Sequence, residues 1–120
     1  MTRTLRLTIP GQPVPKQRPR RGAHGNWYTP RETQDYEEMV RVLARSAMRG
    51  QTPMEEIVRV HVWVHGRKGR RDADNCLKAV LDGLTGAAYL DDSQVVDCRI
   101  AWDGVPVGED MTTVLVEEVG

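Results

Sequence analysis

Phenylalanine is absent from this chain of 120 residues, which also contains only two cysteines and three histidines. A buried core must therefore be built from valine, leucine, isoleucine, methionine and the three tryptophans. Cys76 and Cys98 have no metal-type spacing, so we expect reduced thiols and a cytoplasmic protein. The N-terminus lacks the apolar stretch of a signal peptide, and no segment approaches the roughly 20 apolar residues of a membrane helix. We therefore expect no contact with a membrane.

Acidic residues are scarce in the first part of the chain, and basic residues are scarce in the second. Residues 1–71 contain 15 basic and 6 acidic residues, a net charge of +9, whereas residues 72–120 contain 2 basic and 11 acidic residues, a net charge of −9. A protein that is neutral overall can still bind a polyanion through its basic part. The length, with 39% apolar and 28% charged residues, indicates one soluble domain over residues 1–120.

The spacing of apolar residues predicts an α+β domain, a small mixed β-sheet with two helices in the order β-α-β-α-β-β. Alternating residues predict the strands, and apolar residues three and four positions apart predict the helices. We expect strands at 3–9, 57–64, 95–102 and 112–116 and helices at 30–49 and 74–85. Thr29 is the expected N-cap of the first helix. Four of the seven prolines lie in residues 11–30, which predicts a long loop.

The second helix and the loop after it carry an unusual set of polar side chains. The set consists of Asp72, Asp74, Asn75, Lys78, Asp82, Asp91 and Asp92. Ionised carboxylates at close range repel each other, and a divalent cation relieves this repulsion. Oxygen ligands with few histidines favour magnesium or manganese over zinc. A lysine among the acids, Lys78, indicates a site that handles a phosphate or a developing negative charge.

A simpler interpretation of the same residues is structural. Asp72 or Asp74 can cap the helix, and Asp74, Lys78 and Asp82, which are spaced by four residues, can form a surface ladder of opposite charges. The loop with Asp91 and Asp92 comes near the start of the helix only if the sheet brings it there. The spacing along the sequence does not decide this point.

Two basic segments accompany the acids. They contain Lys16, Arg18, Arg20 and Arg21 in the long loop and Arg67, Lys68, Arg70 and Arg71 directly before the acidic stretch. We expect both to bind the phosphates of a nucleic acid, so that the shape of the nucleic acid, and not its base sequence, dominates the affinity. Trp27 and Tyr28 lie near the first group, where an aromatic ring can stack on an unpaired base. The alternative is a solvated loop whose two aromatic residues pack on the first helix.

The motif Asp72-x-Asp74-Asn75-x-x-Lys78-x-x-x-Asp82, followed by Asp91-Asp92-Ser93-Gln94-Val95, closely resembles the RusA family of Holliday junction resolvases, common in phages and prophages. The segments Gly11-Gln-Pro-Val-Pro-Lys16-Gln-Arg18-Pro-Arg20 and Tyr28-Thr29-Pro30 also resemble that family. The resemblance covers almost the whole chain. It implies a homodimer that binds four-way junction DNA and cuts two opposite strands by paired, symmetric nicks during recombination and repair.

The resemblance also implies roles for individual residues. Asp72, Asp74, Lys78 and Asp92 would be catalytic, and Asp72, Asp74 and Asp92, with Asp91 as the alternative within its pair, would bind Mg2+, for which Mn2+ can substitute. Asn75 and Asp82 would support them. Each subunit would carry one such site in the cytoplasm of a bacterial or phage-infected cell, and no further protein partner is expected.

Two other functions fit parts of the sequence. A DNA-junction binding protein would use the acids only to fold the helix and would bind junctions without cutting them. A magnesium-dependent enzyme that acts on small phosphate compounds would leave the two basic segments without a purpose, and the chain has no glycine-rich phosphate-binding loop. We therefore expect a magnesium-dependent, structure-selective endodeoxyribonuclease.

Overall fold

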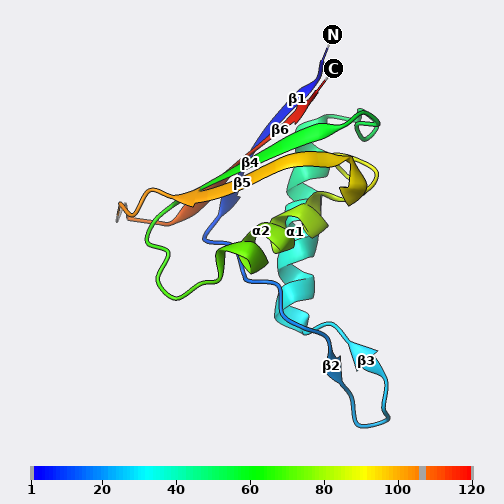
Figure 1. The fold of residues 1–120 in the computed structure, drawn as a ribbon, viewed down its shortest axis with the longest axis vertical. Coiled ribbons are helices and arrows are strands. Elements are labelled where there is room, and N and C mark those ends of the chain that lie inside the picture. The colour runs from blue at the N-terminus through cyan, green and yellow to red at the C-terminus, as the bar shows by residue number, and fades with distance from the viewer. Residues whose placement is uncertain (1, 106–107, 120) are drawn as a thin grey trace.

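The computed structural model describes residues 2–105 and 108–119, which form a four-stranded β-sheet, two long helices and a small separate hairpin (Figure 1). The elements are β1 (Thr4–Pro10), β2 (Arg20–Arg21), β3 (Trp27–Tyr28), α1 (Arg31–Met48), β4 (Val58–His65), α2 (Ala73–Leu84), the short 3-10 helix η1 (Asp92–Gln94), β5 (Val95–Trp102) and β6 (Met111–Glu118). The predicted α+β class and the order β-α-β-α-β-β are confirmed, with the hairpin as an addition within the long loop. None of the described helices is long and apolar enough to cross a membrane.

The strand order of the sheet is β1-β6-β4-β5. β6 pairs antiparallel with β1 and β4, whereas β4 and β5 are parallel because α2 returns the chain between them. Val58 therefore pairs with Val95, and Val64 pairs with Trp102. The two parallel strands thus start at one end of the sheet and finish at the other, and β5 forms an edge.

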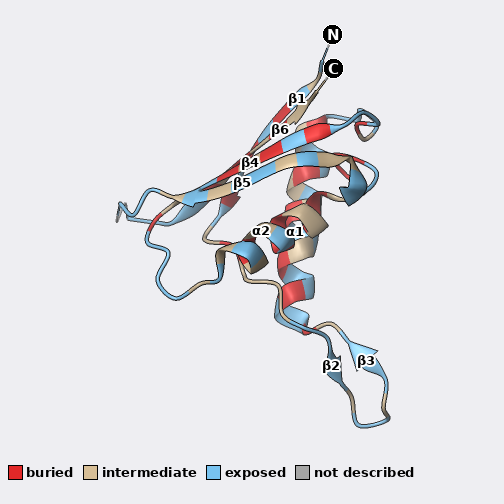
Figure 2. Cartoon of the chain, viewed as in Figure 1, coloured by how far each residue is buried: buried red, intermediate tan, exposed pale blue. Residues whose placement is uncertain are grey.

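One face of the sheet carries the core. In β4, Val58, Val60, Val62 and Val64 are buried and alternate with exposed or half-buried residues, as the two-residue period of a strand requires. The buried residues of α1 and α2 belong to the same cluster, so both helices cover this face. Figure 2 shows the buried positions as a stripe along α1 and at alternate positions of the strands.

The two helices approach each other closely at Gly83. A Cβ atom at this position of α2 would lie 2.6 Å from the Cβ atom of Val40 in α1 and 3.0 Å from the carbonyl oxygen of Glu37. A hydrogen atom is the largest group that this contact accommodates without a shift of a helix. The contact fixes the position of α2, the helix that carries the predicted site residues Asp74, Asn75, Lys78 and Asp82.

The helix ends differ in detail from the predictions. Pro30 and not Thr29 is the N-cap of α1, and no side chain caps it, so the predicted Thr29 cap is wrong. The reason is that Pro30 has a ψ of 141°, outside the helical region, and the helix starts one residue later. α1 ends at Met48, followed by Arg49 in the left-handed region with a φ of 51°.

Candidate active site and nucleic-acid interface

The N-terminus of α2 carries three of the predicted catalytic residues. Asp72 is the N-cap, and its carboxylate accepts a hydrogen bond from the backbone N–H of Asn75 at 3.2 Å. Asp74 lies in the first turn, where the partial positive charge of the helix end stabilises a carboxylate. Lys78 follows one turn later, and the three side chains are exposed. Asp72 therefore does cap the helix, and Asp74 and Lys78 face solvent beside it.

Asp82 forms its salt bridge with Lys16, whereas its spacing in the sequence suggested Lys78 as the partner. The Nζ atom of Lys16 lies 3.1 Å from Oδ2 of Asp82 and 2.6 Å from Oε1 of Glu37. Burial alone would lower the pKa of Lys16, but the hydrogen bonds to Glu37 and Asp82 outweigh this effect and raise it. Lys16 is among the predicted DNA-binding residues, and here two carboxylates balance its charge. Sequence reasoning missed Glu37, because partners 21 residues apart leave no local signal.

Residues 12–17 lie along the N-terminal half of α2 and are hydrogen-bonded to it. The backbone N–H of Lys16 donates to the carbonyl oxygen of Asn75 at 2.9 Å. The Cys76 thiol lies 3.9 Å from the carbonyl oxygen of Pro13, and burial raises the pKa of this thiol. Cys76 is a buried free cysteine, and its raised pKa disfavours the reactive thiolate form.

Asp91 and Asp92 lie at the start of η1, directly before β5. The Asp91 carboxylate accepts hydrogen bonds from the hydroxyl and the backbone N–H of Ser93, and these bonds lower the pKa of Asp91. Gln94 completes a capping box by accepting from the Asp91 N–H at 2.8 Å, and its amide donates to two carbonyl oxygens of residues 54–56. Asp91 therefore caps η1. The neighbouring Asp92 is exposed and does not cap η1.

The two groups of acids lie at opposite ends of α2. Asp72 and Asp74 are at its N-terminus, while Asp91 and Asp92 follow its C-terminus. A helix of 12 residues is about 18 Å long, which is far beyond the span of one cation with its ligands. Among residues 2–105 and 108–119, no three histidine, cysteine, aspartate or glutamate side chains lie close enough to hold a metal ion. One subunit therefore does not assemble the predicted magnesium ligands.

The basic loop between β4 and α2 precedes the N-terminus of that helix. Gln12, which sequence reasoning missed, holds the loop through a hydrogen bond from its amide to the carbonyl oxygen of Arg67 at 2.8 Å. The side-chain oxygen of Gln12 accepts from the indole N–H of Trp102 at 2.9 Å. The Lys68 ammonium lies 5.8 Å from the centre of the Trp102 ring, within range of a cation–π interaction. Residues 67–70 are exposed and so present their charges to solvent.

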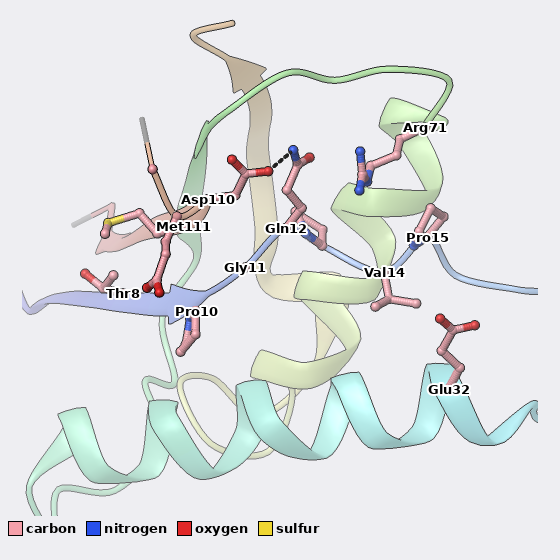
Figure 3. A pocket seen from close by; sticks show the side chains of 13 residues that line it. Thr8, Pro10, Gly11, Gln12, Val14, Pro15, Glu32, Arg71, Asp110 and Met111 are labelled. Carbon is pink, nitrogen blue, oxygen red and sulfur yellow. Dashed lines mark hydrogen bonds between the residues drawn. The ribbon is translucent and has the colours of Figure 1, made fainter. Parts of the chain in front are cut away.

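A cleft of about 840 Å3 lies beside this loop, between the segment after β1 and the turn before β6 (Figure 3). Gln12 reaches into it and donates to the Asp110 carboxylate at 2.8 Å. The charged residues of its lining are Arg71 and three acids, Glu32, Glu109 and Asp110. This lining has a net negative charge, so the cleft is unsuited to a phosphate group.

The hairpin of β2 and β3 extends away from the sheet beside the N-terminus of α1 (Figure 1). Arg20 pairs with Tyr28, and Arg21 pairs with Trp27. Trp27 and Tyr28 are 70% and 48% exposed, so the alternative in which both pack on the first helix is wrong. Arg18, Arg20 and Arg21 are exposed as well. The hairpin therefore presents basic and aromatic side chains together.

Comparison with known proteins identifies one family. Residues 10–117 match the family model described as endodeoxyribonuclease RusA. The crossover junction endodeoxyribonuclease RusA of Escherichia coli strain K12 is 35% identical over 99 residues, which cover 81% of each chain. The proteins of the same name from Shigella sonnei strain Ss046 and from Enterobacteria phage 82 are 35% identical over the same share of the chain.

Proposed function

Because the chain belongs to the endodeoxyribonuclease RusA family, we propose that it is a magnesium-dependent endonuclease that resolves four-way DNA junctions by paired, symmetric nicks. The name of its relatives, crossover junction endodeoxyribonuclease, supports this substrate. The observation that carries the proposal is the N-terminus of α2, where Asp74 and Lys78 are exposed directly after the basic residues 67–71. The enzyme would act as one domain, in recombination and repair, in the cytoplasm of a bacterial or phage-infected cell.

The residues at this helix end have complementary tasks. Residues 67–71 bring positive charge next to the carboxylates, so a DNA backbone bound by the loop is held near Asp72 and Asp74. Lys78 supplies an ammonium group that stabilises negative charge developing on the phosphate. A bound magnesium ion would neutralise the acids and supply an activated water.

We assign the magnesium ligands to two subunits. Asp72 and Asp74 of one subunit would be joined by Asp92 of the partner subunit, while Asp91 keeps its role as the cap of η1. The support for this assignment is the separation of the two groups along α2, which leaves each group short of the ligands that a magnesium ion needs. A closed dimer with two-fold symmetry then contains two identical sites, one for each cut.

The edge strand β5 offers a way to join the subunits. It is the outermost strand next to β4, and Val96 within it is 56% exposed. Two β5 strands paired antiparallel about a two-fold axis would place the start of each beside the end of the other. Asp92 directly precedes the start of β5, whereas Asp72 follows the end of β4, which pairs with the end of β5. Such pairing would bring the two groups of acids to the same end of the joined sheet.

Cleavage of a synthetic four-way junction in the presence of magnesium tests the activity. We expect the wild type to make paired nicks at symmetric positions, and Asp74→Asn to bind the junction but cut it at least about 100-fold more slowly. Asp35→Asn is the matched control, because Asp35 is an exposed aspartate of α1 at 73% side-chain exposure, and it should cut like the wild type.

Two results would contradict the proposed activity. A wild type that binds junctions tightly and cuts with neither magnesium nor manganese is a junction-binding protein. A wild type that prefers a mononucleotide to a junction is an enzyme for small phosphate compounds.

Mixing two inactive variants tests the shared site. A dimer of one Asp74→Asn subunit and one Asp92→Asn subunit would contain one intact site if the ligands come from both subunits, because the intact Asp74 and Asp92 then meet. We expect such mixtures, refolded together, to nick one strand of the junction, while each variant alone stays inactive. An inactive mixture whose mixed dimers are verified by mass spectrometry would place all ligands within one subunit.

A further inference from the structure

The arm, defined here as residues 18–28 with the strands β2 and β3, is a hairpin that holds its own shape. The N–H of Gly22 donates to the carbonyl oxygen of Asn26 at 2.7 Å, and the N–H of Gly25 donates to the carbonyl oxygen of Gly22 at 3.0 Å. Figure 1 shows the arm projecting away from the sheet and from both helices. Its side chains are therefore available for contact with another molecule.

The base of the arm is fixed to the body on both sides. The N–H of Gln17 donates to Oγ1 of Thr33 in α1 at 3.4 Å, and the amide of Gln34 donates to the carbonyl oxygen of Thr29 at 2.6 Å. The salt bridges of Lys16 connect the same base to α1 and α2. The arm consequently starts from a fixed point relative to the N-terminus of α2.

Each face of the arm carries one aromatic ring and one guanidinium group. Trp27 and Tyr28 are neighbours in β3, so their side chains point to opposite faces. Arg21 pairs with Trp27 and Arg20 pairs with Tyr28, and residues directly opposite in a hairpin share a face. Trp27, at 70%, is the most exposed of the large hydrophobic residues described, so its ring adds little to the stability of the fold.

The positive charge of the arm favours a polyanion as its binding partner. Residues 1–31 contain no aspartate or glutamate, and the arm itself carries Arg18, Arg20 and Arg21. Exposed rings beside cations suit a nucleic acid, because each base offers a flat face and each sugar is followed by a phosphate. Four-way DNA supplies both features at its branch point, where bases lose neighbours on one side.

We infer that Trp27 stacks on a base exposed at the branch point of the junction, while Arg20 and Arg21 bind the neighbouring phosphates. This inference rests on the proposed function for its substrate and adds the residue that separates branched from linear DNA. In a linear duplex both faces of each base are covered by stacked neighbours, so the Trp27 ring gains nothing there. Loss of the ring should weaken binding to the junction alone, and loss of an arginine should weaken binding to both DNAs.

Binding measurements without magnesium, in the Asp74→Asn background, separate these contributions. For Trp27→Ala we expect the affinity for a four-way junction to fall about 10-fold, and the affinity for a linear duplex of the same sequence to change less than about 2-fold. Trp27→Phe keeps an aromatic face and should retain most of the junction affinity. Arg21→Gln should lower both affinities by the same factor, and all variants should unfold at the temperature of the parent.

A 2-aminopurine base at the branch point reports the stacking directly, because its fluorescence falls when a ring stacks on it. The parent should quench this fluorescence, and Trp27→Ala should not. Equal losses of affinity for both DNAs, or no loss, would overturn the inference. So would a changed oligomeric state of Trp27→Ala in ultracentrifugation with unchanged DNA binding, since the arm would then bind protein.

The wild type and Trp27→Ala, the latter made in the chain that keeps Asp74, distinguish this inference from the proposed function when their cleavage of junctions is measured in magnesium. If the wild type never cuts junctions but binds them in a way that depends on Trp27, the nuclease activity is refuted and the stacking role stands. If Trp27→Ala cuts junctions with unchanged preference over linear DNA, the stacking role is refuted and the nuclease activity stands.

Discussion

The ammonium group of Lys16 lies 3.1 Å from the carboxylate of Asp82, so the N-terminal segment is bound to the helix that begins after Asp72. The same ammonium lies 2.6 Å from Glu37 in α1. One side chain therefore connects three segments that are far apart in the sequence. It also determines where the basic residues after it can reach.

Replacement of Lys16 by methionine should destabilise the protein. Glu37 and Asp82 would then face each other without a cation, and the Glu37 side chain is only 13% exposed. We expect the free energy of unfolding to fall by about 1–3 kcal/mol in urea titrations at neutral pH. Adding Glu37→Gln should restore part of the loss, because it removes one of the two unpaired carboxylates. Equal stability of Lys16→Met and the wild type would contradict this role.

The raised pKa of Lys16 predicts how this contribution depends on pH. Its stabilising effect is complete below the usual lysine value of 10.5 and is lost as the pH rises through the higher pKa of the folded state. The difference in unfolding free energy between the wild type and Lys16→Met should therefore shrink in strongly alkaline solution. Urea titrations at neutral pH and well above the usual lysine pKa measure it. A difference that grows with pH would show that the sign is wrong.

Asp91 should contribute to the stability of the fold, and Asp92 should contribute to the cleavage of DNA. Asp91→Ala removes the cap of η1, so we expect a lower midpoint of urea unfolding, whereas Asp92→Ala should unfold like the wild type but not cut junctions. The hydrogen bonds from Ser93 lower the pKa of Asp91, so its contribution is present above the usual value of 3.8 and lost as the pH falls through the lower folded value. Unfolding curves and cleavage assays on both variants test this division.

Gly83→Ala should separate α1 from α2. The added methyl group would lie 2.6 Å from the Cβ atom of Val40, so one helix must shift, and we expect a loss of about 1–3 kcal/mol in unfolding free energy. In a double-mutant cycle with Val40→Ala, the double variant should be less destabilised than the sum of the single ones. Gly22→Ala in the arm is the control, because its nearest contact would be 3.4 Å. Strict additivity would mean that the two residues do not contact each other.

Arg70→Gln should change the salt dependence of DNA binding. Each phosphate contact that is lost lowers the slope of log affinity against log salt concentration by about 0.9, and the reduction should be equal for different DNA sequences. Arg45→Gln, in the last turn of α1 and away from both basic segments, should leave the slope unchanged. An equal slope for Arg70→Gln and the wild type would exclude a phosphate contact at Arg70.

The local periodicity of apolar residues in the sequence predicted most of the fold. The alternation in residues 57–64 and the apolar stripe that includes Tyr36 and Val40 predicted β4 and α1 to within one or two residues, because burial on one face repeats with the period of the element. The short strands β2 and β3 were missed, since two residues are too few to establish a period. Partners distant in sequence, such as Lys16 and Glu37, depend on helix packing and leave no trace in spacing.

The separation of Asp72 and Asp74 from Asp91 and Asp92 can in principle be predicted from the order of β4, α2 and β5 along the chain. A strand, one helix and a parallel strand return the chain to the end of the sheet where the first strand began, so the start of β5 must lie away from the start of α2. The helical spacing of Asp74, Lys78 and Asp82 identifies a face and says nothing about which end a later loop approaches. The parallel pairing of β4 and β5 places Asp92 at the end of α2 opposite to Asp72 and Asp74.

That one parallel pair, in a sheet that is otherwise antiparallel, has a consequence for control of the enzyme. On the proposed arrangement, a lone subunit would hold only part of each cation site and would not cut DNA. Magnesium affinity would then rise with protein concentration, and both sites would form together when two copies meet. Incision in one strand without its counterpart, which would leave a junction damaged and unresolved, would be disfavoured before any DNA is bound.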